Sequence, residues 1–196
     1  MALSENQVHY FISYTVAFVA FGLIARWYVW PAVRDATPRQ ALTPLLLYAS
    51  FRVNGLMFLM PGHVSTHLPK AFAIPTAYGD LTAGVLALLA VWPTRAEKSA
   101  AMPLVWLFNI VGLLDLIYAN ISTFRNHVDP TYLGVSYYLA AINVPAMVVV
   151  HLVIFAYLVK HRGGAKQLMA NTRKVSSSSC VNRIVWTTCP MPWSCL

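Results

Sequence analysis

Five apolar runs, separated by short polar connections, constrain this chain more than any other feature. They lie at about residues 8–30, 42–60, 71–92, 103–121 and 132–159. Each is close to the roughly 20 residues that an α-helix needs to cross a ~30 Å hydrocarbon core. The sequence therefore predicts an all-α fold, a polytopic transmembrane helix bundle with five spans.

The basic residues orient this bundle. Five spans place the two termini on opposite sides, and basic segments are retained in the cytoplasm during insertion. With the C-terminus inside, only Lys70 and Arg125 of the 14 Lys and Arg lie outside, and Arg52 lies within a span. The other eleven are cytoplasmic: Arg26, Arg34, Arg39, Arg95, Lys98, Lys160, Arg162, Lys166, Arg173, Lys174 and Arg183. We therefore predict a multi-pass protein of the inner or plasma membrane, with its N-terminus outside.

The third run leaves an alternative open. Its strictly apolar part covers only residues 81–92, and Pro75 interrupts the part before it. One helix kinked at Pro75 would cross the membrane, whereas a re-entrant segment would give four spans and both termini on one side. The single helix is simpler, because irregular backbone in lipid must be buried in protein.

The chain divides into a membrane domain, residues 1–161, and a tail, residues 162–196. The tail contains basic residues, a serine run and the three cysteines, and it lacks a helical or strand period. We predict that it is cytoplasmic and disordered. Cytoplasmic cysteines rarely form disulfides, so none is expected.

Composition agrees with a protein whose main partner is the lipid bilayer. Hydrophobic residues make up 58% of the chain and charged residues 10%, against about 25% charged residues in soluble domains. The net charge of +8 lies almost entirely on the predicted cytoplasmic side, where it attracts anionic lipid. No basic and aromatic motif accompanies this charge, so no nucleic-acid partner is predicted.

Arg52 lies near the middle of the second run, eight residues from its outer end at residue 60. An arginine at the bilayer centre costs about 3 kcal/mol on insertion scales, and it needs hydrogen-bond acceptors because it stays charged. Asp115 lies six residues from the outer end of the fourth run, so the two depths agree within about 3 Å. We predict that Arg52 pairs with Asp115, and Asp80 in the third run is the second candidate, so Asp115 or Asp80, or both, would neutralise the buried charge.

Three further polar residues lie within spans. Asn109 is in the fourth run, and Asn143 precedes Pro145, which frees the carbonyl of Ala141. His151, in the inner part of the fifth run, is either neutral and bonded to a neighbouring helix or part of a proton path. The predicted buried polar cluster is therefore Arg52, Asp80, Asp115, Asn109, Asn143 and His151. Such groups either bond helices together or mark a pathway.

Histidines of the predicted outer face are the candidates for metal binding. His63 and His67 are four residues apart, and His127 lies in the next outer connection. Solvated histidines are the alternative, because Pro61-Gly62 and Pro69 make a helix across this stretch doubtful, and no metal site is predicted. A b-type haem needs two facing buried histidines, and His151 has no such partner, so no cofactor is predicted.

Motifs of common enzyme classes are missing. The chain has no Gly-x-Gly-x-x-Gly, no phosphate-binding loop, no His-Glu-x-x-His and no Gly-x-Ser-x-Gly. The connections between runs are too short to hold a soluble catalytic domain. No catalytic residue is predicted on these grounds.

Residues 48–92 resemble small bacterial integral membrane proteins of the DoxX-like kind. The resemblance is carried by Phe51-Arg52-Val53-Asn54-Gly55-Leu56-Met57-Phe58, continuing to Gly62, and by Tyr78-Gly79-Asp80-Leu81 before an Ala/Leu helix. It implies a small membrane subunit, sometimes tied to redox partners, with no uniform activity. DoxX-like proteins typically have four spans, and the apolar runs here predict five.

These observations favour an accessory or structural membrane subunit, associated with other membrane subunits or with a second copy. The first alternative is a small-molecule or proton transporter in which Arg52 and the aspartates line a cavity. The second is a membrane enzyme acting on a lipid or quinone, with Asp115, Asp80 and His151 as its acids and bases.

Overall fold

The computed structural model describes residues 4–161, and it is all-helical there. The N-terminal part comprises α1 (Glu5–Ile24), a π-helical turn η1 (Ala25–Val29), the short α2 (Trp30–Val33), α3 (Pro38–Ser50) and a 3₁₀ helix η2 (Phe51–Leu59). Then follow α4 (Lys70–Arg95), α5 (Ala101–Arg125), a second 3₁₀ helix η3 (Pro130–Ser136) and a second π turn η4 (Leu139–Asn143). The predicted tail, 162–196, lies outside the described residues.

Five segments are long and apolar enough to cross a membrane: Glu5–Val33, Pro38–Leu59, Lys70–Arg95, Ala101–Arg125 and Leu139–His161. The last, which continues from η4, is called the fifth span below. The all-α fold with five spans is thereby confirmed. The four-span alternative is wrong, because α4 runs without interruption through Pro75. The fifth span was predicted to start at residue 132, but Pro130–Ser136 forms η3 instead.

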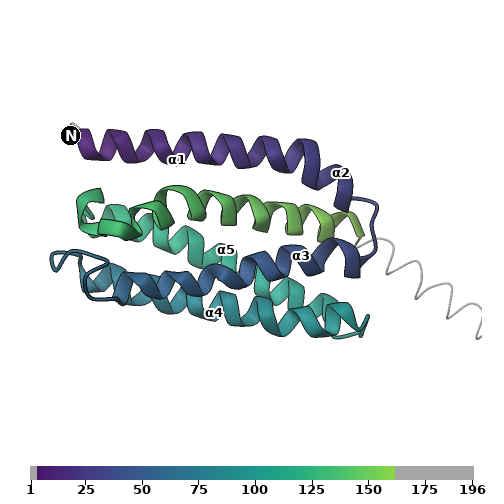
Figure 1. Ribbon diagram of the computed structural model, residues 1–196. Helices are drawn as coiled ribbons and strands as arrows, with labels where there is room; N and C mark the ends of the chain where they lie inside the picture. Colours follow the sequence, from purple (N-terminus) through teal and green to yellow (C-terminus); the bar gives the residue numbers. More distant parts are fainter. Residues whose placement is uncertain (1–3, 162–196) are drawn as a thin grey trace, which may run out of the picture. The chain divides into compact units, whose positions relative to one another are not determined.

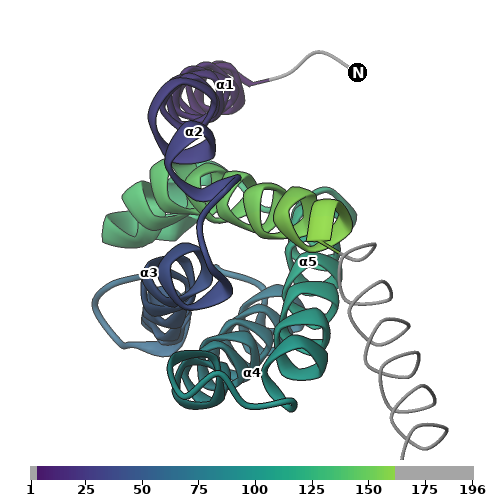
Figure 2. The same cartoon turned by 90° about the vertical axis from the view of Figure 1, so that its right-hand side faces the viewer.

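Successive spans run in opposite directions (Figure 1). The connections 34–37 and 96–100 therefore lie at one end, called the basic end because Arg34, Arg39, Arg95 and Lys98 lie there. The connections 60–69 and 126–138 lie at the other, called the loop end. Viewed along the helices, α1 lies outside the group formed by α3, α4, α5 and the fifth span (Figure 2). No residue of α1 is buried.

Both π turns stand in the same relation to a proline. Each ends two residues before one, η1 before Pro31 and η4 before Pro145. A proline ring clashes with the carbonyl four residues earlier, here of Trp27 and of Ala141, the central residues of the two turns. Widening the helix by one residue relieves this clash, which accounts for both π turns.

The bundle core has two apolar clusters. The one toward the basic end includes Leu42, Leu46, Phe108, Ile154 and Tyr157, all buried. The one toward the loop end is built around Phe58, Leu68, Phe72, Val128 and Leu133. Small side chains let α4 approach its neighbours closely: Ala73, Ala77, Ala83, Gly84, Ala87 and Ala90 are buried along it.

Backbone hydrogen bonds tie the two loop-end connections together. Ser65 N–H donates to the carbonyl of Tyr132 at 2.8 Å, and Val135 N–H donates to the carbonyl of His63 at 3.0 Å. Gly62 turns the first connection with φ of +84°, a conformation that favours glycine. Asp129 caps η3, and hydrogen bonds from the side chain and backbone N–H of Thr131 lower the pKa of its carboxyl.

Candidate functional site

The 3₁₀ geometry of η2 positions Arg52. A 3₁₀ helix has three residues per turn, so side chains three apart lie on one face. Arg52, Gly55 and Phe58 are buried on that face of η2, while Val53 and Asn54 are exposed. In an α-helix these three positions would drift around the axis, so the tighter helix aims Arg52 into the bundle.

Arg52 is buried, with 2% of its surface exposed. Its Nε donates to Oδ1 of Asp80 at 2.8 Å, and its NH2 nitrogen lies 2.7 Å from the same oxygen. The NH2 nitrogen also donates to Oδ2 of Asp115 at 2.5 Å. Arg52 therefore forms ion pairs with both predicted partners, one on α4 and one on α5.

The other terminal nitrogen of Arg52 faces the fifth span. NH1 donates to the carbonyl of Gly112 at 2.8 Å and lies 3.2 Å from Nε2 of His151. Because a guanidinium only donates, Nε2 must accept, which leaves the imidazole proton on Nδ1. That nitrogen lies 2.8 Å from Oδ1 of Asn109 and donates to it. His151 is therefore neutral and bonded to neighbouring helices, the first of its two predicted roles.

Three glycines make room for these side chains. A Cβ added at Gly55 would clash with the carboxyl group of Asp80, and one at Gly79 with that of Asp115. A Cβ at Gly112 would lie 2.5 Å from Cε1 of His151 and 2.9 Å from NH1 of Arg52. Each glycine thus faces a side chain of the cluster, on a helix other than its own.

The ionised groups do not balance. One guanidinium faces two carboxylates, and the imidazole of His151 beside the guanidinium is neutral, which gives a net charge of −1 when both acids are ionised. Asp80 and Asp115 keep only 13% and 12% of their side-chain surface exposed. A buried uncompensated charge is costly, so this arrangement favours holding one proton or one small cation.

Five of the six predicted cluster residues lie together. We call Arg52, Asp80, Asp115, Asn109 and His151 the Arg52 cluster. Asn143 is half-buried, and it forms no hydrogen bond with this cluster in residues 4–161. The amide nitrogen of Asn109 is buried and has no partner among the same residues.

Sequence reasoning missed the Gly112 carbonyl and the role of the glycines. The signal was present, because Gly79 adjoins Asp80 and Gly112 lies one helical turn before Asp115. Glycine next to a charged residue within a span indicates a close approach of two helices.

The three loop-end histidines lie in different local surroundings. His63 lies in the turn after Pro61, His67 packs its ring against Tyr132, and His127 has a positive φ after α5. No group of three or more His, Cys, Asp or Glu side chains that could hold a metal ion is found within residues 4–161.

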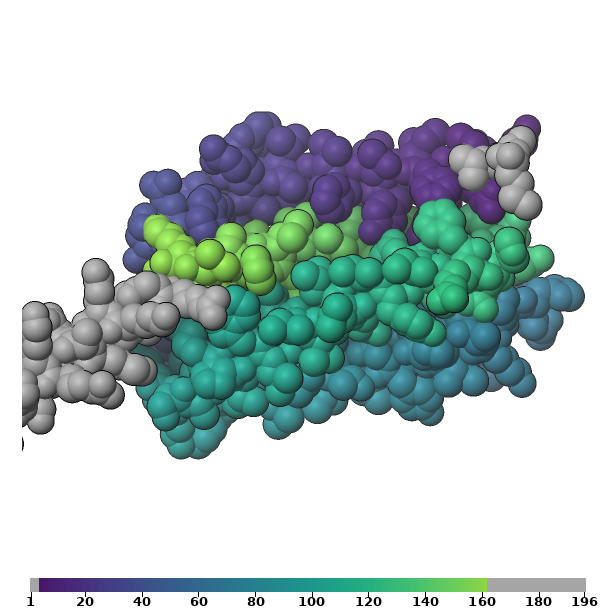
Figure 3. Space-filling model, turned by 180° about the vertical axis from the view of Figure 1, so that it is seen from behind, coloured from purple at the N-terminus to yellow at the C-terminus, as the bar shows by residue number. Residues whose placement is uncertain are grey.

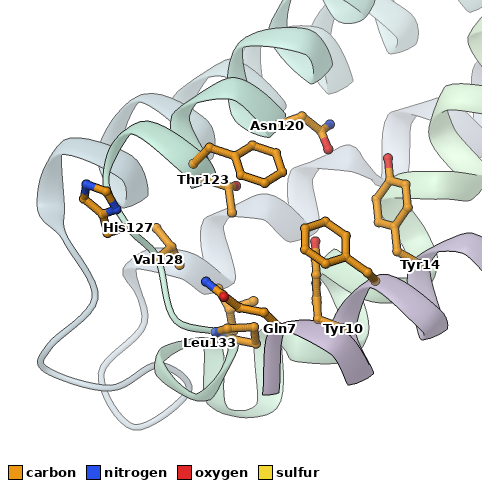
Figure 4. Close-up of a pocket in the computed structure, with 11 residues that line it drawn as sticks. Gln7, Tyr10, Tyr14, Asn120, Thr123, His127, Val128 and Leu133 are labelled. Atoms are coloured by element: carbon orange, nitrogen blue, oxygen red, sulfur yellow. The ribbon is translucent and has the colours of Figure 1, made fainter. Parts of the chain in front are cut away.

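A cavity of about 370 Å³ lies at the loop end, between α1, α5 and η3. Tyr10 and Tyr14 of α1 face Asn120 and Thr123 of α5 across it (Figure 4). The ring of Phe11 stacks on that of Phe124 at 5.9 Å. No residue of the Arg52 cluster lines this cavity, so it is separate from the charged site.

Comparison with known proteins gives a family but no activity. No curated protein matches the chain, and no solved structure matches it. The resemblance to DoxX-like proteins stays a prediction. One family model, described as a domain of unknown function (DUF8737), matches residues 9–159, which contain all five residues of the Arg52 cluster. Because this match covers most of the chain, the protein belongs to the DUF8737 family.

Proposed function

We propose that this protein is an accessory or structural membrane subunit, in which the Arg52 cluster bonds four of the five spans to one another. One observation carries this proposal. The five N–H groups of Arg52 are matched by five contacts: two with Asp80 and one each with Asp115, the Gly112 carbonyl and His151. A guanidinium with every donor engaged has none left for a substrate.

The peripheral α1 supplies the surface for assembly. Its large apolar side chains are exposed, among them Ile12 (56%), Val16 (62%) and Val19 (53%). Lipid covers such a face in a lone subunit, and another membrane subunit or a second copy would cover it in an assembly. The resemblance to DoxX-like proteins supports the same role.

We place the protein in the inner or plasma membrane with the basic end in the cytoplasm. The positive-inside rule supports this orientation, because Lys70 and Arg125 are the basic residues at the loop end of the described chain. Ser4 and Ser65 then lie outside and Lys98 inside.

Single-cysteine labelling tests this topology. In a chain whose tail cysteines are replaced by serine, a membrane-impermeant maleimide on intact cells should label Ser4→Cys and Ser65→Cys. Lys98→Cys should be labelled only after the cells are opened. Labelling of Ser4→Cys and Lys98→Cys from the same side would contradict the five-span orientation.

A proton-coupled transporter is the second candidate, and the charge imbalance of the cluster favours it. A site that holds one proton between Asp80 and Asp115 becomes a carrier if it opens to each side in turn. Transport would require Arg52 to exchange its bonds with the two carboxylates during each cycle.

Flux in proteoliposomes separates the two functions. The subunit proposal predicts no proton or small organic anion flux between pH 5 and 8, and the same null result for Arg52→Gln. A transporter would give saturable flux that Arg52→Gln abolishes and that Asp115→Asn uncouples from protons. Arg95→Gln, at an exposed position of α4 outside the cluster, is the matched control. Arg52-dependent flux would overturn the subunit proposal.

A further inference from the structure

A second charged feature lies at the basic end, apart from the Arg52 cluster. A groove of about 490 Å³ separates the first span from the fifth. Phe18, Gly22, Ala25, Arg26 and Trp30 line it from the first span, and Arg34 lines it from the connection that follows. Its opposite wall is apolar and consists of Val149, Leu152, Val153 and Ala156.

The polar groups are concentrated at one end of this groove. Arg26, Trp30 and Arg34 follow one another at intervals of four residues toward the basic end, whereas Phe18 and Gly22 lie deeper along α1. Arg26 belongs to the π turn η1 that precedes Pro31. The groove therefore has two guanidinium groups and an indole at one end and apolar side chains along the rest of its length.

The deeper part of the groove is open at Gly22. A Cβ added there would meet no atom within 4 Å. α1 lies along the fifth span (Figure 3), and yet it buries none of its own residues. The described chain therefore leaves space between α1 and the bundle that a long apolar group can fill.

The charges at the mouth favour an anion. Arg26 forms no ion pair in the described chain, and Arg34 bonds Asp35 through Nε at 3.0 Å, with both side chains largely exposed. Asp35 does not line the groove. The side chains of Arg26 and Arg34 both line the groove, and guanidinium geometry suits phosphate oxygens.

We propose that this groove binds one anionic phospholipid. The phosphate lies on Arg26 and Arg34, Trp30 packs at the level of the headgroup, and an acyl chain follows Phe18, Gly22 and Leu152. Tryptophan and arginine are typical of the membrane interface, and anionic lipid is enriched on the cytoplasmic side. The lipid would fill the space between α1 and the fifth span, and so stabilise a helix that has little protein packing.

The test uses the full-length protein in a neutral detergent. Native mass spectrometry and thermal unfolding are measured with added phosphatidylglycerol and with phosphatidylcholine. We expect phosphatidylglycerol to be retained about tenfold more than phosphatidylcholine, a difference of ~1.4 kcal/mol in binding free energy. Phosphatidylglycerol should also raise the Tm, because a ligand that binds the folded protein stabilises it. Arg26→Gln/Arg34→Gln should remove this preference.

The control is Arg39→Gln/Arg95→Gln, which removes the same charge from exposed arginines of the basic end that do not line the groove. It should keep the preference for phosphatidylglycerol. Equal losses in both double variants would overturn the site in favour of nonspecific attraction by the basic end. Stabilisation of the same size by inorganic phosphate alone would also overturn it, because the acyl chain would then contribute nothing.

Gly22→Phe tests the acyl position without changing the charge. The added ring should occupy the channel, lower phosphatidylglycerol retention severalfold and leave the protein folded, since the position is open. Undiminished retention in this variant would show that no acyl chain passes Gly22, and would overturn the proposed binding mode.

Discussion

Replacing Arg52 with methionine is expected to destabilise the bundle by about 3–5 kcal/mol, because it strands two buried carboxyl groups without a cation. Asp80 and Asp115 both depend on the guanidinium, and His151 loses its donor as well. The loss is measured as a change in the free energy of unfolding in detergent. Arg95→Met, at an exposed position, should change it by less than about 0.5 kcal/mol.

A double-mutant cycle shows that the effect comes from the ion pairs. Arg52→Met and Asp115→Leu should each be costly, and the double variant should cost clearly less than their sum. The residual cost of the double variant belongs to Asp80, which still lacks its partner. Strict additivity would mean that Arg52 and Asp115 do not interact energetically.

Gly112→Ala is expected to destabilise the protein by about 1–3 kcal/mol, as overpacking of a close-packed interior does. The new methyl would lie 2.5 Å from Cε1 of His151 and 2.8 Å from its Nε2, so the imidazole must move away from Arg52. The variant is compared with the wild-type chain by the same unfolding measurement.

Gly22→Ala is the matched control, also a glycine within a helix. Nothing lies within 4 Å of its added Cβ, and alanine has the higher helix propensity by up to about 1 kcal/mol. It should be neutral or stabilising. Similar losses at Gly22 and Gly112 would show that contact with His151 is not what makes Gly112→Ala costly.

Much of the Arg52 cluster could be predicted because burying a charge demands compensation. An arginine at the centre of an apolar run needs an acid at matching depth, and Asp115 and Asp80 are both bonded to it. Asn143 was predicted to join the cluster because Pro145 frees the carbonyl of Ala141, and it forms no hydrogen bond with the cluster in residues 4–161. Depth along a span follows from position in the sequence, but rotation about the helix axis does not.

The geometry around Arg52 depended on a departure from the α-helix. Interpreting residues 42–60 as one α-helix gave no reason for Arg52, Gly55 and Phe58 to share a face. They share one because Phe51–Leu59 is a 3₁₀ helix packed against α4. Nothing in the local propensity of these residues distinguishes the two helix types, so packing made the choice.

The sequence by itself determined that the chain forms five apolar helices and that Arg52 must find acidic partners. Both follow from what the sequence contains directly: the length of each apolar run, and the position of a lone charge whose burial is costly. The tertiary structure alone decided that both aspartates bond Arg52, that Asn109 orients His151, and that α1 lies apart from the cluster. These features depend on how closely the helices approach and on how each helix is rotated about its axis. Gly55, Gly79 and Gly112, which are far apart in the sequence, together allow the close approach.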